Sequence, residues 1–331
     1  MPSARYARWD GVGRPFQFVE TDRPDPVAGE TLVEIDLATI CGSDLHTVAG
    51  HRPGPAPSVL GHEQIGRTVA GDRVVWSVVV SCFGCTRCAR GLPQKCLNLR
   101  KFGHEPLTAG WTLSGGFATH ALLPPGTTIV PVPDTLPDVV AAPAACATAT
   151  VAAMLDAADP VNGRRVLVTG AGLLGVTAAA MCAAAGAEVT VSDPDPARQA
   201  LARRFGAEHV VGPDNRPRAV DVALELSGAP AAVAACLDAL DVGGRAILAG
   251  SVSPAPPVPV DPEQIVRRLL TVHGVHNYRP EHLVQAVAFL AAHHERFPFA
   301  QLVGDTFALS QLDRAFEQAG RTPRVAVDPR R

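Results

Sequence analysis

A short glycine-rich stretch, TGAGLLG at residues 169–175, restricts the fold of this chain more than any other feature. It places Gly170, Gly172 and Gly175 in G-x-G-x-x-G spacing, after a buried-strand run and at the start of a helical run. In that context the first glycine permits a tight turn, the second admits a pyrophosphate close to the backbone, and the third allows close helix–strand packing. The stretch therefore predicts a dinucleotide site at a helix N-terminus.

The segments around and after this stretch alternate between strand-like and helix-like patterns. Alternation of this kind predicts a doubly wound parallel sheet, and we expect residues 136–279 to form this Rossmann domain. The expected strands are 164–170, 187–193, 221–228, 243–252 and 269–275, and the expected helices are 173–186, 196–207 and 229–240. The Pro-rich SPAPPVPVDP at 253–262 is expected to be a rigid connection.

The first 135 residues differ in composition and pattern, because they are rich in Gly and Pro and have short β-like runs between turn signals. They predict a β-rich, partly barrel-like domain. The tail adds two helix-like segments and a last strand, PRVAVDP, which we expect to return to the first domain. Residues 1–135 and 280–331 are therefore assigned to one domain. The β-like runs are 31–40, 72–80 and 117–125, and the tail segments are 280–297, 309–320 and 323–329.

Composition excludes several classes of protein. The chain has 331 residues, 47% of them hydrophobic, and a net charge of −3, which argues against nucleic-acid binding and against a polybasic membrane surface. The N-terminus has no signal-peptide pattern and no apolar run reaches the length of a membrane span, so we expect a cytoplasmic protein. Stable disulfides are rare in the cytoplasm, and the eight cysteines are therefore expected to be metal ligands and core thiols.

Asp193 stands at the end of the second expected strand, 21 residues after Gly172. A carboxylate there accepts from ribose hydroxyls and repels a 2′-phosphate, which predicts NAD as the cofactor rather than NADP. Arg198 is a counter-argument, because a guanidinium five residues further on could reach a phosphate. The alternative role for Asp193 is a cap on the helix that starts near Pro196.

Four of the cysteines lie in SCFGCTRCARGLPQKC, residues 81–96. The C-x2-C-x2-C-x7-C spacing supplies four thiolates with no open position, which is typical of a structural zinc site. An iron–sulfur electron carrier is the competing interpretation, but there the fourth cysteine follows after three residues and precedes a proline. The ligands are Cys82, Cys85, Cys88 and Cys96, and Arg87, Arg90 and Lys95 are placed to offset their charge.

A second possible metal site is scattered along the chain, in CGSDLH, GHE and PAACATAT. Cys41, His62 and Cys146 supply two thiolates and one imidazole, a set that leaves a zinc position open for water or substrate. This predicts a catalytic zinc, and hence two zinc ions per chain. The two remaining cysteines, Cys182 and Cys236, lie in apolar helical stretches and are expected to be core thiols.

With these motifs in this order, the chain resembles the zinc-dependent medium-chain alcohol dehydrogenases, whose catalytic domain has a GroES-like fold. The resemblance covers nearly the whole chain. The matching pieces are CGSDLH, GHE, the cysteine cluster, GDRV, GGFATH, the Cys146 segment and the glycine stretch. Within the family it is most similar to alcohol dehydrogenases associated with phosphonate catabolism, through GLPQKC, KFGHE, LSGGFATHALLPPGT, CATATVAA and VHGVHNYRPEHL. One departure is the short linker at 70–72, close in sequence to His62.

The resemblance implies a role for each matching residue. Glu63 would lie beside the metal, Asp44 would hold the His62 imidazole, Ser43 would contact the reacting oxygen, and His46 would pass its proton to solvent unless it is a plain surface residue. Cofactor contacts are implied at Thr150, Gly170, Gly172, Leu173, Leu174, Gly175, Asp193, Arg198, Ser227, Ser251, Val252, His276, Asn277 and Arg324. His104 and Glu105 are assigned to a loop or pocket wall.

The predicted activity is reversible, zinc-dependent hydride transfer between a small alcohol and NAD, with a hydroxyalkylphosphonate as one candidate substrate. A polyol, sugar or aminocyclitol dehydrogenase on the same scaffold is the first alternative, and a non-enzymatic zinc-binding or regulatory protein is the second. An anionic substrate would need a cationic anchor, and the candidates by residue type and rough location are Arg52, Arg100, Lys101 and Arg279. Surface solvation is the favoured interpretation for each of the four.

The resemblance also implies a homodimer or homotetramer paired through an edge strand near 270–275.

Overall fold

The computed structural model describes residues 3–331, which divide into two compact units. Of the described residues, the first unit comprises 3–146, 279–294 and 299–331, and the second comprises 147–278 with 295–298. The expected boundary near 135 is therefore displaced. Residues 138–145 form α3 (Asp138–Ala141) and a 3-10 turn (Ala142–Ala145), which pack on strands of the first unit. Phe297 stacks on Phe205, with ring centroids 6.3 Å apart, so residues 295–298 join the second unit.

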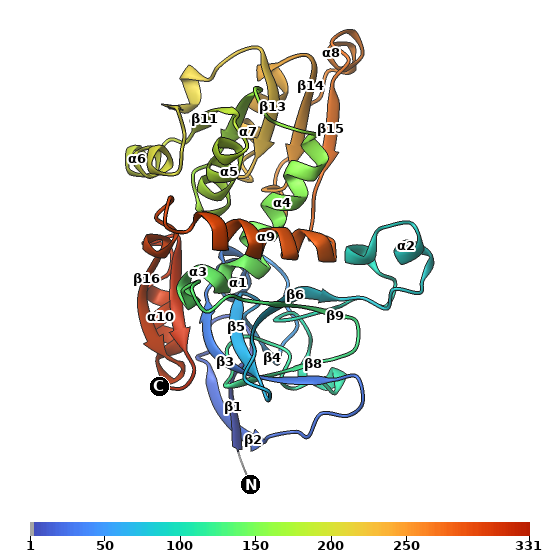
Figure 1. The fold of residues 1–331 in the computed structure, drawn as a ribbon, viewed down its shortest axis with the longest axis vertical. Helices are drawn as coiled ribbons and strands as arrows, with labels where there is room; N and C mark the ends of the chain where they lie inside the picture. The colour runs from blue at the N-terminus through green and yellow to red at the C-terminus, as the bar shows by residue number, and fades with distance from the viewer. Residues whose placement is uncertain (1–2) are drawn as a thin grey trace. The chain divides into compact units, whose positions relative to one another are not determined.

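The second unit is the expected doubly wound sheet, with six parallel strands in the order β12-β11-β10-β13-β14-β15. Figure 1 labels β11, β13, β14 and β15 of this sheet. This order places the carboxyl ends of β10 and β11 beside each other, where dinucleotides bind. The strands are β10 (Arg165–Thr169), β11 (Glu188–Ser192), β12 (His209–Val211), β13 (Val220–Glu225), β14 (Leu240–Leu248) and β15 (Thr271–Gly274). The helices are α4 (Ala147–Ala158), α5 (Leu173–Ala184), α6 (Pro196–Arg204), α7 (Pro230–Ala239) and α8 (Pro262–Arg267).

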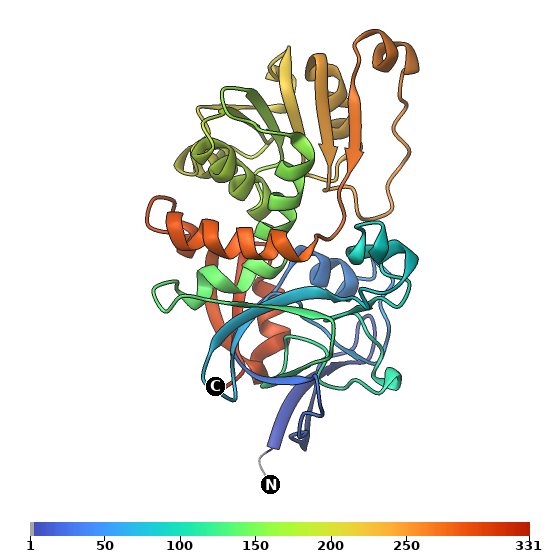
Figure 2. The same ribbon diagram turned by 45° about the vertical axis from the view of Figure 1, so that its right-hand side comes forward.

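The central strands of this sheet are buried, as a parallel sheet covered by helices requires. Leu167, Val168, Val222 and Leu224 are fully buried, and α4 packs against α5 and β14. Neither α4 nor the three-residue β12 was expected as a separate element. The Pro-rich connection has no strand or helix before α8 and is the long orange loop in Figure 2.

The first unit contains an eight-stranded sheet with the path β16-β17-β3-β5-β6-β7, to which β8 and β9 are added, and a smaller sheet β2-β1-β4. The last strand, β17, pairs with β3, so the chain's end does return to the first unit. The strands are β1 (Ser3–Trp9), β2 (Gln17–Asp22), β3 (Thr31–Thr39), β4 (Ser58–Val59), β5 (Gln64–Thr68), β6 (Arg73–Val80), β7 (Arg100–Lys101), β8 (His120–Leu123), β9 (Thr127–Pro131), β16 (Val303–Ala308) and β17 (Arg324–Asp328). The remaining α-helices are α1 (Gly42–Val48), α2 (Thr86–Ala89), α9 (Pro280–His293) and α10 (Leu312–Gln318).

The short linker after β5 forms a tight hairpin. Thr68 and Asp72 are joined by a backbone hydrogen bond of 3.0 Å, and Gly71 adopts φ 91°, which suits glycine at this turn. Arg67 and Arg73 are register partners across the hairpin. The departure from the family pattern therefore shortens a β-turn and leaves the β5–β6 pairing intact.

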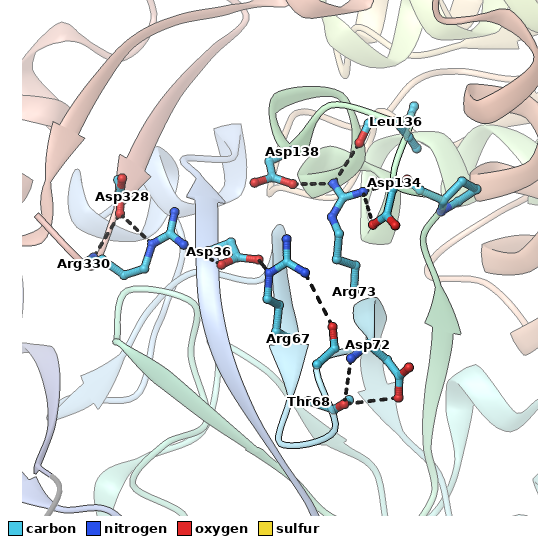
Figure 3. A network of polar contacts seen from close by, with 12 residues as sticks. Asp36, Arg67, Thr68, Asp72, Arg73, Asp134, Leu136, Asp138, Asp328 and Arg330 are labelled. Atoms are coloured by element: carbon cyan, nitrogen blue, oxygen red, sulfur yellow. Dashed lines mark hydrogen bonds and ion pairs between the residues drawn. The ribbon is translucent and has the colours of Figure 1, made fainter.

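The two register partners differ sharply in their surroundings (Figure 3). Arg73 is buried and donates to the carbonyls of Pro133 and Leu136 at 2.6 and 2.8 Å and to the Asp138 carboxylate at 2.5 Å. Arg67 has a side chain that is 48% exposed and lies 3.3 Å from the buried carboxylate of Asp36, which Arg330 also contacts at 2.7 Å. Arg73 thus fixes the segment that leads through α3 to Cys146.

No single helix among residues 3–331 is long and apolar enough to cross a membrane. One bent pair of helical segments, 138–145 with 147–158, has the combined length and composition of a span.

Arg73→Ala should lower the free energy of unfolding by about 3 kcal/mol, because it leaves the Pro133 and Leu136 carbonyls and the Asp138 carboxylate without the donor that Arg73 supplies from a buried position. The matched Arg67→Ala change removes an exposed contact and should cost less than about 1 kcal/mol. Urea unfolding of both variants measures the difference. Equal losses in the two variants would contradict the assigned role of Arg73.

Candidate active site

Three metal-ligand side chains from distant parts of the chain meet in the first unit. Cys41 follows β3 and begins α1, His62 precedes β5, and Cys146 ends the 3-10 turn after α3. Their ligand atoms all lie within 4.8 Å of one another, and the two sulfurs are 4.0 Å apart. Tetrahedral zinc with sulfurs at about 2.3 Å needs a sulfur–sulfur separation of roughly 3.8 Å. The donor set therefore fits zinc with a fourth position open.

Asp44 orients this centre from α1. Its Oδ1 lies 3.3 Å from His62 Nδ1, and its Oδ2 accepts from the backbone N–H of Cys41 at 2.9 Å. Burial alone would lower the pKa of His62, but the Asp44 carboxylate raises this pKa above its ordinary value. A carboxylate at Nδ1 holds the proton there and leaves Nε2 for a metal. Ser43 Oγ lies 3.2 Å from His62 Nε2, which places the hydroxyl beside the same centre.

Glu63 and Arg324 form a buried pair behind the ligands. The guanidinium contacts both carboxylate oxygens, at 2.6 and 2.7 Å, and its NH2 lies 3.4 Å from Cys41 Sγ. Thr39 donates to the same carboxylate at 2.7 Å. Burial raises the pKa of Glu63 to about 7 against the opposing charge of Arg324. A hydrogen bond with Cys146 lowers the pKa of Cys41 well below its ordinary value, and Arg324 adds to this effect.

Arg324 was expected to contact the cofactor pyrophosphate, but its side chain lies beside the metal ligands. The residue is buried, and two of its guanidinium nitrogens are used on Glu63 and Cys41. The cause is the pairing of β17 with β3, which brings residue 324 next to the metal ligands. Glu63 and Arg324 are 261 positions apart, and no sequence motif predicts their contact.

Two further histidines flank the centre. His46 is exposed on α1, with its ring 5.9 Å from that of His51. His104, which the sequence assigned to a loop or pocket wall, lies with its ring centroid 5.0 Å from that of His62. Its Nδ1 is 2.8 Å from the Phe102 carbonyl, so Nδ1 carries the proton and Nε2 is an acceptor. Glu105 accepts from the backbone N–H of Lys101 at 2.7 Å and braces this loop.

The cysteine cluster forms a second centre around α2. All eight cysteines of the chain are free thiols, and the four sulfurs here lie within 4.8 Å of one another, with neighbouring separations of 3.3 to 3.9 Å. Backbone N–H groups point at the sulfurs, from Leu97 to Cys85 at 3.4 Å and from Asn98 to Cys96 at 3.3 Å. The Leu97 N–H is the main reason that the pKa of Cys85 falls to about 6. Four thiolates held in this way fit a closed zinc site.

The glycine loop has the geometry that a dinucleotide requires. Gly170 adopts φ 90°, and Gly175 packs so closely that an added Cβ would lie 1.8 Å from the carbonyl oxygen of Gly170. At Gly172, the N-cap of α5, an added Cβ would meet nothing within 4 Å. The backbone is therefore open to a ligand at the helix N-terminus, with Leu173 and Leu174 in the first turn.

Asp193 lies directly after β11 beside this loop. One carboxylate oxygen accepts from Ala171 N–H at 2.7 Å and the other from Asp195 N–H at 2.9 Å. The cap on α6 is Asp195, which accepts from Ala197 N–H at 2.8 Å, so Asp193 does not fill the capping role. Arg198 is exposed and lies 3.8 Å from Asp195.

The loops that follow β13 and β14 carry other expected cofactor contacts and one unexpected residue, Glu225. It is fully buried and accepts from Ser227 and Gly228 N–H groups at 2.8 and 2.7 Å and from the Ser251 hydroxyl at 3.2 Å. The one feature of the sequence that could have indicated Glu225 is its position, at the end of a strand and shortly before Ser227 and Gly228. Asn277 adopts φ 58°, and its buried Nδ2 has no hydrogen-bond partner among the described residues. Of the other expected contacts, Thr150 lies on α4, and Val252 and His276 are exposed on loops.

Comparison with known proteins finds two matching families. The alcohol dehydrogenase GroES-like domain family matches residues 27–134, and the zinc-binding dehydrogenase family matches residues 174–292. L-threonine 3-dehydrogenase of Pyrococcus abyssi is 32% identical over 289 residues, which cover 78% of this chain and 79% of that protein. 5-exo-hydroxycamphor dehydrogenase of Pseudomonas putida is 29% identical over 339 residues, covering 92% and 93%. The structure of an alcohol dehydrogenase from Thermotoga maritima superimposes with a TM-score of 0.92 at 26% identity, covering 99% of this chain and 100% of that one.

The predicted fold class, enzyme class and cofactors, zinc and a nicotinamide dinucleotide, are confirmed by these matches, while the resemblance to phosphonate-associated enzymes stays a prediction. The chain belongs to the zinc-dependent medium-chain alcohol dehydrogenases.

Proposed function

We propose that the enzyme transfers a hydride between a small alcohol and NAD, reversibly to the aldehyde or ketone. The observation that carries this proposal is the three-ligand centre of Cys41, His62 and Cys146, which leaves one tetrahedral position for a substrate oxygen. The non-enzymatic alternative lacks support, because each ligand of this centre is present and converges with the others.

Several residues around this centre take part in the proposed proton transfer. Zinc, when bound, supplies Lewis acidity to the substrate oxygen. Asp44 holds His62 in the tautomer that binds a metal, and the Ser43 hydroxyl, next to His62 Nε2, accepts the substrate proton as it gives up its own proton toward His46 through the cofactor ribose. His46 is exposed on the same helix and exchanges that proton with solvent. Glu63 remains beside the ligands and can assist ligand exchange, while Arg324 compensates its charge.

The cofactor is proposed to lie at the glycine loop of the second unit. The N-terminal N–H groups of α5 bind the pyrophosphate, and Asp193 receives the adenosine ribose and disfavours a 2′-phosphate. Glu225 holds the loop of Ser227 and the side chain of Ser251 in place. The unsatisfied Asn277 amide is an available donor, and together with Thr150, Val252 and His276 it is assigned to the nicotinamide end.

The cysteine cluster is proposed to hold the second zinc, in a structural role. Its backbone donors stabilise thiolates, and the four sulfurs leave no open position.

The proposed substrate is a hydroxyalkylphosphonate, by resemblance to the phosphonate-associated enzymes. A polyol, sugar or aminocyclitol is the alternative, because the same zinc and cofactor sites would serve it.

The protein is also proposed to be a cytoplasmic homodimer or homotetramer. Reduced thiols, which both metal centres need, are typical of the cytoplasm. β15 supports pairing with a second copy, since all four of its residues are exposed and, among the strands that the structure describes, it pairs with β14 alone.

Cys41→Ser should lower kcat for alcohol oxidation by about a thousandfold or more, because it weakens the charge stabilisation that a bound metal provides. Circular dichroism should show the fold retained. Steady-state rates of NADH formation measure the effect. Cys182→Ala, at a buried thiol in α5, is the control and should keep most of the activity. Normal turnover by Cys41→Ser would show that the catalytic assignment is wrong.

The wild-type enzyme should prefer NAD over NADP in kcat/KM, since the Asp193 carboxylate repels a 2′-phosphate. Asp193→Ala should reduce this preference at least about tenfold, and Asp195→Ala, two residues further on and exposed, should change it little. Initial rates with both cofactors give the ratios. A wild-type preference for NADP would refute the role of Asp193.

A further inference from the structure

Two histidine side chains meet at the end of α1, outside both cysteine-containing centres. The ring centroids of His46 and His51 are 5.9 Å apart, and the ring planes are tilted by 53°. Both side chains are exposed. Among residues 3–331, neither imidazole makes a side-chain hydrogen bond or an ion pair. Each neutral ring therefore has an acceptor nitrogen that no protein donor occupies.

The backbone explains why these two side chains meet. The sequence HTVAGH at 46–51 ends α1 in a Schellman motif, with Gly50 at φ 78°. The Gly50 N–H donates to the Thr47 carbonyl at 3.1 Å, and the His51 N–H donates to the His46 carbonyl at 2.9 Å. This motif brings together the side chains three positions before the helix cap and two positions after it, which are often apolar. Here both positions carry histidine, so the backbone itself places the rings side by side.

The separation of the rings suits one shared metal ion. Bonds from zinc to histidine nitrogen are about 2.0–2.1 Å long, so the centroids of two rings on one ion stand roughly 5–6.5 Å apart, depending on the angle at the metal. The observed 5.9 Å lies in this range. Exposed side chains change rotamer rapidly, so the two rings can turn their nitrogens toward a common ion. Imidazole suits zinc, nickel and copper, and water would complete the coordination.

A metal ion at this pair would interfere with proton transfer. His46 lies on the same helix as Ser43 and is the residue proposed to exchange the substrate proton with solvent. An imidazole nitrogen that is bound to a metal has no lone pair left to accept a proton. His51 lies after the helix and has no role in the proposed reaction, so it can be replaced without removing the proton path.

We propose that His46 and His51 form a third metal site, which binds Zn²⁺ or a similar divalent transition metal and inhibits the enzyme by blocking proton exchange at His46. The metal site rests on the geometry of the two rings, whereas the inhibition rests on the proposed function. The catalytic centre has three protein ligands and this site has two, so it should fill only when zinc is in excess over both other centres.

Calorimetry with zinc chloride tests the site directly, on protein whose two other centres are already loaded and at about pH 8, where imidazole is neutral. The wild type should bind one additional zinc ion. His51→Gln and His46→Gln should each bind it at least about tenfold more weakly. His209→Gln removes an exposed imidazole from β12 in the second unit and should bind like the wild type. Unchanged zinc binding by both His46→Gln and His51→Gln would overturn the site.

Steady-state rates test the inhibition. Saturating zinc should lower the wild-type kcat at least about tenfold, within the range that acid–base steps contribute. His51→Gln should match the wild-type kcat without added zinc and lose most of the inhibition. His46→Gln should begin with a lower kcat and respond little to zinc.

The two measurements separate the site from the reaction. Zinc binding that depends on both histidines, in a protein that oxidises no alcohol, would support the site and defeat the proposed function. Inhibition that persists undiminished in His51→Gln would overturn the inhibitory role of the pair.

Discussion

The buried ion pair between Arg324 and Glu63 is the contact on which the catalytic centre depends most. It joins the last strand of the chain to the residue after a metal ligand, and it reaches the sulfur of Cys41 as well. A buried charge without its partner costs several kcal/mol, so neither residue can be removed alone without disturbing the centre. The pairing of β17 with β3 therefore supports the proposed catalytic centre as well as the fold.

The two cysteine-containing centres differ in which parts of the chain supply their ligands and in what surrounds those ligands. The cluster at 82–96 comes from one short segment, and its sulfurs accept backbone N–H groups of the same segment. The catalytic centre is built from three distant segments, and its second layer consists of charged side chains, Asp44, Glu63 and Arg324. A closed site needs only thiolates in a fixed geometry. A reactive site also needs groups that control charge and protonation around an open position.

The sequence was most informative where a site is local or where spacing alone determines chemistry. The glycine loop, the parallel sheet and the two cysteine-containing ligand sets follow from short patterns, and the structure brings each of these sets together. The position of Arg324, the proximity of His104 to His62 and the buried role of Glu225 could not be predicted, because each depends on strand pairing or loop packing between distant segments. The domain boundary moved for the same reason, since residues 139–145 are apolar and residues 138–145 pack on the first unit.

We propose that each chain binds two zinc ions, one in a closed four-sulfur site and one in an open site of two sulfurs and one imidazole. X-ray absorption at the zinc edge, combined with metal counting on the intact protein, tests this occupancy. Averaged over two zinc ions per chain, the spectrum should show about three sulfurs at about 2.3 Å and about one nitrogen or oxygen at about 2.0–2.1 Å for each zinc. A single zinc with four sulfur ligands, or iron in the cysteine cluster, would contradict the account.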